Sequence, residues 1–168
     1  MADIQHINEH YFDKVNKVRT AIIKAIEYYL PVSVLTNETL SKEFPEWSIS
    51  KIENKVGISS RHISSENEFA SDLAVSAAKK LFDSGACSAK EIDYILLCTQ
   101  SPDYLLPTTA CLVQHQLNIP KTAGAVDINL GCSGYVYGLS IAKGLIESHQ
   151  ANNILFITCI TGNCSSAL

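Results

Sequence analysis

VDINLGCSGYVYGL, which spans residues 126–139, leads from an apolar segment through a cysteine flanked by small residues into a helix-forming segment. Residues 123–129 predict a strand, and residues 133–148 predict a helix that begins almost at once. Two further apolar runs, residues 92–99 and 153–158, are short and nearly continuous, which is typical of strands buried on both faces of a parallel sheet. This alternation predicts an α/β fold whose mostly parallel sheet is covered by helices on both faces.

The helices between these strands carry end signals of their own. Residues 66–84 form the clearest one, with Ser65 and Glu68 as a capping-box pair and Gly85 just after the last turn. Pro107 is suited to the start of another helix, because the first amide of a helix has no internal partner to lose.

The first part of the chain has weaker signals. Residues 1–16 predict a loosely attached extension, so the folded part would span residues 17–168. Residues 18–26 are rich in β-branched side chains and predict a strand, with a helix over residues 21–29 as the alternative; Pro31 would end either one.

Two short helices are predicted next. Asn37 is a suitable N-cap for a helix that continues through Phe44. Pro45 would be the first residue of a second helix, which contains Trp47 and ends at Gly57.

Composition limits the classes of function. The 168 residues suit one domain, and 46% hydrophobic against 18% charged residues is too apolar for a disordered chain. The net charge of −4 and the scattered lysines and arginines argue against nucleic-acid binding and against a basic membrane-binding face. Because there is no long apolar run and no signal-peptide pattern, we expect a soluble cytoplasmic protein.

Cys132 is the strongest candidate for chemistry among the six cysteines. The others lie mostly in apolar segments, and no CxxC pair occurs, which indicates reduced thiols and no zinc site. At a strand-to-helix turn, the Cys132 side chain would be exposed, the helix N-terminus would favour the thiolate, and free amides could bind an oxyanion. Thiolate attack on a thioester is nearly balanced, which suits acyl transfer. The alternative from the residues alone is a small core cysteine beside glycines.

The helix after Cys132 contains several small residues. Gly134, Gly138 and Ala142 lie four apart on one face, and Gly144 is also present. Each interior glycine costs about 1 kcal/mol relative to alanine. We therefore expect the backbone of this helix to pack closely against another element.

Four motifs carry a resemblance to a known family: YYLP at residues 28–31, KVGISSRHI at 55–63, TQSPDYLLPTTAC at 99–111 and DINLGCSGYVYGL at 127–139. Together they resemble the N-terminal half of β-ketoacyl-acyl-carrier-protein synthase III, a thiolase-like condensing enzyme, over about residues 18–158. The resemblance implies one βαβαβαβ half of a two-half fold, a homodimeric enzyme, and a central position for the glycine-rich helix.

The resemblance also implies roles for single residues. Cys132 would take an acyl group from acyl-CoA for decarboxylative condensation with malonyl-acyl-carrier protein, without a bound cofactor. Leu106 would reach across the dimer into the partner's acyl pocket, Trp47 would stack on the adenine of CoA, and Lys55 would lie near the CoA phosphates. The alternatives for these three are a loop anchor, a core tryptophan and a solvated charge. His62 lies in a matching motif and is expected to be structural.

The chain also departs from the family pattern. The histidine and asparagine that stabilise the enolate come from the family's C-terminal half, and no histidine here lies in a motif that matches the one around that catalytic histidine. Ile160 occupies a position where relatives carry an acidic residue. We therefore expect a truncated fragment, a processed product or a natural half-protein. The alternative to the enzyme is a non-catalytic half-domain that binds a partner or regulates it.

Overall fold

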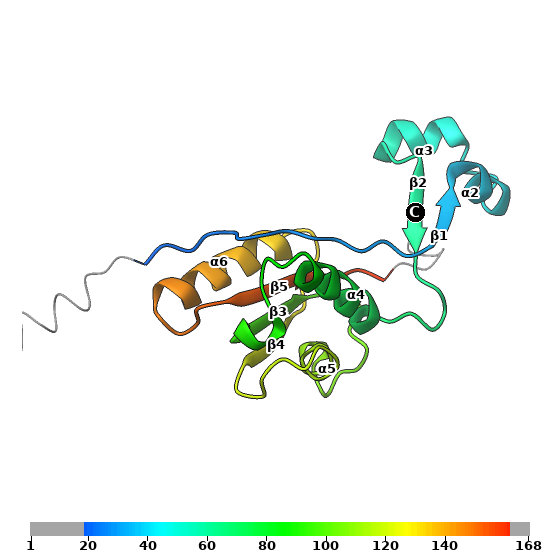
Figure 1. The fold of residues 1–168 in the computed structure, drawn as a ribbon. Helices are drawn as coiled ribbons and strands as arrows, with labels where there is room; N and C mark the ends of the chain where they lie inside the picture. The colour runs from blue at the N-terminus through cyan, green and yellow to red at the C-terminus, as the bar shows by residue number, and fades with distance from the viewer. Residues whose placement is uncertain (1–18, 162–168) are drawn as a thin grey trace, which may run out of the picture.

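The computed structural model describes residues 19–161 (Figure 1), so the predicted extension at residues 1–16 lies outside the described residues. The elements form a parallel sheet with flanking helices and a smaller unit beside it. In chain order they are β1 (Ser33–Thr36), α2 (Asn37–Glu43), α3 (Ile49–Val56), β2 (Ser60–Ile63), α4 (Ala70–Asp83), the short 3₁₀ helix η1 (Ala89–Glu91), β3 (Tyr94–Cys98), α5 (Thr109–Gln116), β4 (Gly124–Ile128), α6 (Gly134–Glu147) and β5 (Ile154–Thr158). No described helix is long and apolar enough to cross a membrane.

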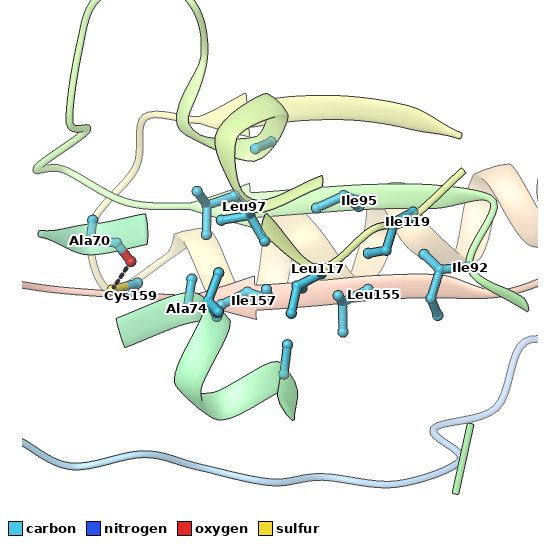
Figure 2. Close-up of a cluster of buried hydrophobic side chains, with 14 of the residues drawn as sticks. Ala70, Ala74, Ile92, Ile95, Leu97, Leu117, Ile119, Leu155, Ile157 and Cys159 are labelled. Carbon is cyan, nitrogen blue, oxygen red and sulfur yellow. Dashed lines mark hydrogen bonds between the residues drawn. The ribbon is translucent and has the colours of Figure 1, made fainter. Parts of the chain in front are cut away.

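The sheet has the parallel strand order β4-β3-β5, with β3 in the centre. Helices α4 and α5 pack together over one face, and α6 covers the other (Figure 1). Ile95 and Leu97 of β3 join Leu155 and Ile157 of β5 in the main core, which α4 and α5 complete (Figure 2). The predicted α/β class, with helices on both faces of a parallel sheet, is confirmed.

Helix α4 begins one turn later than predicted. Glu68 does accept a hydrogen bond from the backbone amide of Ser65, at 3.2 Å, but this pair forms a turn ahead of the helix. The helix itself starts at Ala70, where the Asp72 carboxylate accepts from the amide of Phe69 at 3.0 Å. Gly85 follows the helix with a φ of 76°, as a left-handed residue after a C-terminus should.

The smaller unit is a β1–β2 antiparallel pair with α2 and α3, built around Leu35, Leu40 and Ile52. The two strands were not predicted from the sequence. The N-cap of α2 is Thr36 and not Asn37, because the Thr36 hydroxyl accepts from the amide of Thr39 at 3.3 Å.

The predicted start of the second short helix is also wrong. Pro45 and Trp47 lie in the turn that precedes α3, and Ser48 caps the helix by accepting from the amide of Lys51 at 3.3 Å. Gly57 ends the helix with a φ of 68°, which confirms the predicted stop.

Residues 19–31, called the extended segment below, form neither the predicted strand nor the alternative helix. The segment runs extended past α6 and α4 (Figure 1). No backbone–backbone hydrogen bond joins it to the rest of the described chain. A strand is defined by its neighbour, so β-branched composition alone does not produce one. Its isoleucines Ile22 and Ile26 are mostly exposed.

Candidate active site

Cys132 lies exposed in the turn between β4 and α6, at the strand-to-helix position that the sequence predicted. The amide of Gly134 donates to the carbonyl of Gly131 at 2.8 Å and closes the turn around the cysteine. Helix α6 then begins, and the amides of Tyr135 and Val136 have no backbone acceptor among the described residues. Free amides at the start of a helix, together with the helix dipole, favour a negative charge that lies close to them.

Residues at the end of β3 contact the turn that carries Cys132. The Cys98 thiol donates to the carbonyl of Leu130 at 3.3 Å, and its sulfur lies against Gly134 with no space for a Cβ atom there. The side-chain amide of Gln100 lies against Gly131, where a Cβ atom would be 3.1 Å from Gln100 Oε1. Gln100 was not a candidate from the sequence, and the only signal for it was its place just after a buried strand, inside the quoted loop motif.

Gly134 and Gly138 of α6 face the sheet. Gly138 lies against the ring of Phe156, which leaves no room for a side chain, and Tyr135 stacks on the same ring at a centroid distance of 6.0 Å. The expected close packing of the helix is therefore confirmed at Gly134 and Gly138. At Gly144 it is wrong within the described chain, because no atom lies within 4 Å of a Cβ placed there.

The loop between β3 and α5 is tied down at its base. The Asp127 carboxylate of β4 accepts from the amides of Thr109 and Ala110, both at 2.7 Å, and so caps α5. The Thr109 hydroxyl accepts from the amide of Asp103 at 3.1 Å, and the Asp103 carboxylate accepts from the amide of Ser71 at 3.1 Å. Neither aspartate was a candidate from the sequence, because both roles depend on tertiary contacts.

Leu106 lies at the exposed end of that loop. Its side chain is 83% exposed, and that of Leu105 beside it is 93% exposed. Neither leucine packs as an anchor against the described chain. Helix α5 starts at Thr109, two residues after the predicted Pro107. The base of the loop is therefore held by hydrogen bonds, while its apolar end is exposed to solvent.

Trp47 and Lys55 come together in the smaller unit. Lys55 Nζ lies 4.9 Å from the centre of the Trp47 ring, and Lys51 Nζ lies 4.6 Å from it. Trp47 is half-buried against the Leu35, Leu40 and Ile52 cluster. Lys51 was not a sequence candidate, although its spacing of four from Lys55 places both ammonium groups on one helix face.

Two other titratable side chains, those of Cys159 and His62, contact backbone carbonyl groups. Cys159 is buried and donates to the carbonyl of Ala70 at 3.4 Å (Figure 2). Burial, with the Asp103 carboxylate as a smaller cause, raises the pKa of Cys159 to about 12. His62 Nδ1 lies 2.6 Å from the carbonyl oxygen of Pro31, and this hydrogen bond joins β2 to the end of the extended segment. No three described histidine, cysteine or acidic side chains cluster closely enough to hold a metal ion.

The chain is similar in sequence to known proteins. The family described as 3-oxoacyl-[acyl-carrier-protein (ACP)] synthase III matches residues 126–166. A β-ketoacyl-[acyl-carrier-protein] synthase III of Clostridium perfringens (strain 13) is 45% identical over 129 residues, which are 77% of this chain and 39% of the relative. The corresponding protein of Ehrlichia canis is 41% identical over 140 residues, which are 83% of this chain and 43% of the relative.

Solved structures agree with these relatives. A crystal structure of a 3-oxoacyl-(acyl-carrier-protein) synthase III is 53% identical and has a TM-score of 0.81, over 85% of this chain and 42% of that one. A β-ketoacyl-[acyl carrier protein] synthase III from Thermus thermophilus is 31% identical with a TM-score of 0.77, over 83% and 43%. The chain spans about two fifths of the length of the relatives that it matches.

Proposed function

The chain is a homologue of the β-ketoacyl-[acyl-carrier-protein] synthase III enzymes, and on this premise we propose that Cys132 is the acyl-accepting nucleophile of a condensing acyltransferase. One observation carries the proposal: the exposed Cys132 lies directly before α6, beside first-turn amides that have no described backbone acceptor. A thiolate and an oxyanion both gain from such amides. On this proposal, the chain supplies one half of such an enzyme.

The first half-reaction is acyl transfer to sulfur. The Cys132 thiolate attacks the thioester carbonyl of acyl-CoA, and the negative charge moves to the carbonyl oxygen. Amides of the α6 N-terminus that have no described backbone acceptor, such as those of Tyr135 and Val136, would donate to this developing charge. The carbon–sulfur bond to CoA then breaks, the CoA thiolate takes up a proton from solvent, and acyl-Cys132 remains.

The second half-reaction is the condensation that the relatives' name implies. Malonyl-acyl-carrier protein loses carbon dioxide, its enolate attacks the acyl carbon, and the Cys132 thiolate leaves. This step requires donors for the enolate oxygen. The described histidines have other surroundings. His62 contacts Pro31, His115 is exposed in the last turn of α5, and His149 lies past the far end of α6, roughly 20 Å from its start. The whole enzyme would draw these donors from elsewhere.

Two further features would supply substrate and partner contacts. The aromatic face of Trp47 would hold the adenine of CoA, and the ammonium groups of Lys51 and Lys55 would attract its phosphates. Leu106 would enter the acyl pocket of a second subunit in a homodimer. An apolar side chain held out on a tethered loop gains most when a partner covers it. The enzyme would be cytoplasmic.

A second candidate function is a non-catalytic half-domain that binds a partner subunit. The outer face of α6 supports it, because Val136, Tyr137 and Ile141 are exposed there. An acylation test separates the two functions, since a binding half-domain has no need of a reactive Cys132.

The decisive experiment is intact-mass measurement after incubation with acetyl-CoA. We expect a gain of one acetyl group, which Cys132→Ala abolishes. Cys111 is the matched control, because it is the other exposed cysteine among the described residues. The gain should survive in Cys111→Ala. An acetyl gain that persists in Cys132→Ala, or no gain at all, would refute the nucleophile assignment.

A further inference from the structure

Gln100 lies two residues past the end of β3, at the same edge of the parallel sheet as Cys132. The amide of Thr99 donates to the carbonyl of Ile128 at 3.1 Å, which continues the hydrogen bonding between β3 and β4 past the last residue of β3. The hydroxyl of Thr99 accepts from the amide of Ser101 at 3.0 Å, so the backbone is held on both sides of Gln100. Ligands of parallel sheets bind outside the carboxyl ends of the strands. Gln100 therefore stands at the edge where a ligand of this sheet is expected.

The carboxamide of Gln100 lies over Gly131, the residue before Cys132. A Cβ atom at Gly131 would be 3.1 Å from Oε1 and 3.3 Å from both Cδ and Nε2. Because Cδ is about as close as the two polar atoms, Gly131 contacts the face of the carboxamide and is not in line with either polar atom. The N–H donors of a carboxamide lie in its plane. The contact with the turn therefore leaves these donors unused.

The Gln100 side chain has no hydrogen-bond partner among the described residues. The hydrogen bonds around it use the thiol of Cys98, the hydroxyl of Thr99 and the amide of Asp103. Gln100 is also exposed, so both hydrogens of Nε2 are available to a ligand at the turn. Side-chain amides of this kind are among the groups that stabilise an oxyanion in acyl transfer.

We infer that Gln100 is a further residue of the acyl-transfer site, where its Nε2 donates to the carbonyl oxygen of the thioester that reacts at Cys132. The inference rests on the proposed function and adds a side-chain donor to the amides of α6. When the Cys132 thiolate attacks the carbonyl carbon, the π electrons of the C=O bond move to the oxygen, which the N–H group then bonds more strongly. The electron pair returns as the bond from carbon to the CoA sulfur breaks. The CoA thiolate takes up a proton from solvent, so Gln100 neither gains nor loses one.

A neutral donor affects one kind of reaction at Cys132 and not another. The carboxamide carries no net charge, so it acts on the atom to which it hydrogen-bonds and has little effect at a distance. Acylation places a negative charge on a carbonyl oxygen. Alkylation by iodoacetamide does not, because the thiolate displaces iodide from a CH₂ group. Loss of the donor should therefore slow acylation selectively.

Two substitutions in the full chain separate a donor from a space-filling contact. Gln100→Met keeps a long side chain over Gly131 but has no N–H group, whereas Gln100→Ala removes the contact as well. We expect acetyl-CoA to acetylate Cys132 about tenfold more slowly in both variants, a smaller effect than the loss of an enclosed oxyanion donor. The rate of the intact-mass gain measures this. Gln116→Met, at the exposed end of α5, is the matched control and should react at the rate of the unsubstituted protein.

The rate of alkylation by iodoacetamide is the second readout. It should change little in Gln100→Met, and the buried Cys159 should stay unlabelled as evidence of native folding. Unchanged acetylation in Gln100→Met, or acetylation and alkylation that fall together, would overturn the role of Gln100 and leave Cys132 as the nucleophile. The absence of any acetyl gain in the unsubstituted protein would overturn the proposed function and this inference with it.

Discussion

The sulfur atom of Cys98 lies against the backbone of Gly134, so closely that a side chain at Gly134 would overlap it. The same thiol donates to the carbonyl of Leu130, two residues before Cys132. The end of β3 and the start of α6 therefore fix both sides of the turn that carries the candidate nucleophile. The position of the Cys132 sulfur depends on a contact between a small residue on one element and a thiol on another.

Substitution of Gly134 by alanine tests this contact. Overpacking a close contact costs about 1–3 kcal/mol, which exceeds the gain of up to about 1 kcal/mol from removing a helical glycine. We expect Gly134→Ala to lower the free energy of unfolding and to slow acylation of Cys132. Gly144→Ala is the matched control in the same helix, because a Cβ atom there meets nothing within 4 Å. It should raise the free energy of unfolding by about 0.5–1 kcal/mol. Urea denaturation of both variants measures the difference, and effects of the same sign would contradict the prediction.

The Asp127 carboxylate joins β4 to the first turn of α5. Each of its oxygens accepts one amide at 2.7 Å, from Thr109 and Ala110. In Asp127→Asn one oxygen becomes an NH₂ group that faces an amide donor, so one hydrogen bond is lost and a donor is left unpaired. We expect a loss of about 1–3 kcal/mol in the free energy of unfolding and faster exchange at the Thr109 and Ala110 amides. Asp83→Asn, at the exposed end of α4, should change little. Comparable losses in the two variants would show that charge alone, and not the paired geometry, is responsible.

The parts of this structure that the sequence predicted have local causes. The buried strands β3 and β5 follow from apolar runs, and the position of Cys132 follows from a strand, a turn and a helix that are adjacent in the chain. The role of Asp127 could not be predicted, because it requires the register of β4 against β3 and the placement of α5. The strand prediction for the extended segment was wrong because composition shows only that residues suit a strand. Whether a second strand lies beside them to pair with depends on the tertiary structure. Strands β1 and β2 have four residues each, which is too short for an alternation of apolar and polar side chains to be recognised in the sequence.

Trp47 provides a direct test of CoA binding. It is the only tryptophan in the chain, so its fluorescence reports on one site. We expect CoA to quench this fluorescence, because the adenine would stack on the ring that Lys51 and Lys55 now approach. Lys55→Glu should weaken the affinity by roughly tenfold, the effect of one lost charge-assisted hydrogen bond of about 1.5 kcal/mol. Lys90→Glu, in the separate helix η1, is the control for net charge. Equal weakening in both variants, or no response to CoA, would exclude the site.

Cys132 and Cys159 should differ sharply in their reaction with iodoacetamide. Only the thiolate reacts, and burial with the nearby Asp103 raises the pKa of Cys159 from 9.0 to about 12. At pH 8 the thiolate fraction of Cys159 is on the order of 10⁻⁴. We expect native protein at pH 8 to be labelled at Cys132 and at the exposed Cys111, with Cys159 protected until urea unfolds the chain. Peptide mass spectrometry of the labelled protein measures all three sites.

The same raised pKa predicts an alkaline loss of stability. The folded state holds the Cys159 proton more tightly than the unfolded state does. The resulting contribution to the free energy of unfolding is fully present below about pH 9 and is lost as the pH rises toward 12. Cys159→Ala removes the titrating thiol, although it also removes the hydrogen bond to Ala70. The variant should therefore be less stable at pH 8, yet lose less of its remaining stability between pH 8 and pH 10 than the unsubstituted protein does. Urea unfolding at the two pH values gives both slopes. Parallel slopes, or native labelling of Cys159 as fast as that of Cys111, would show that the thiol is not held protonated by burial.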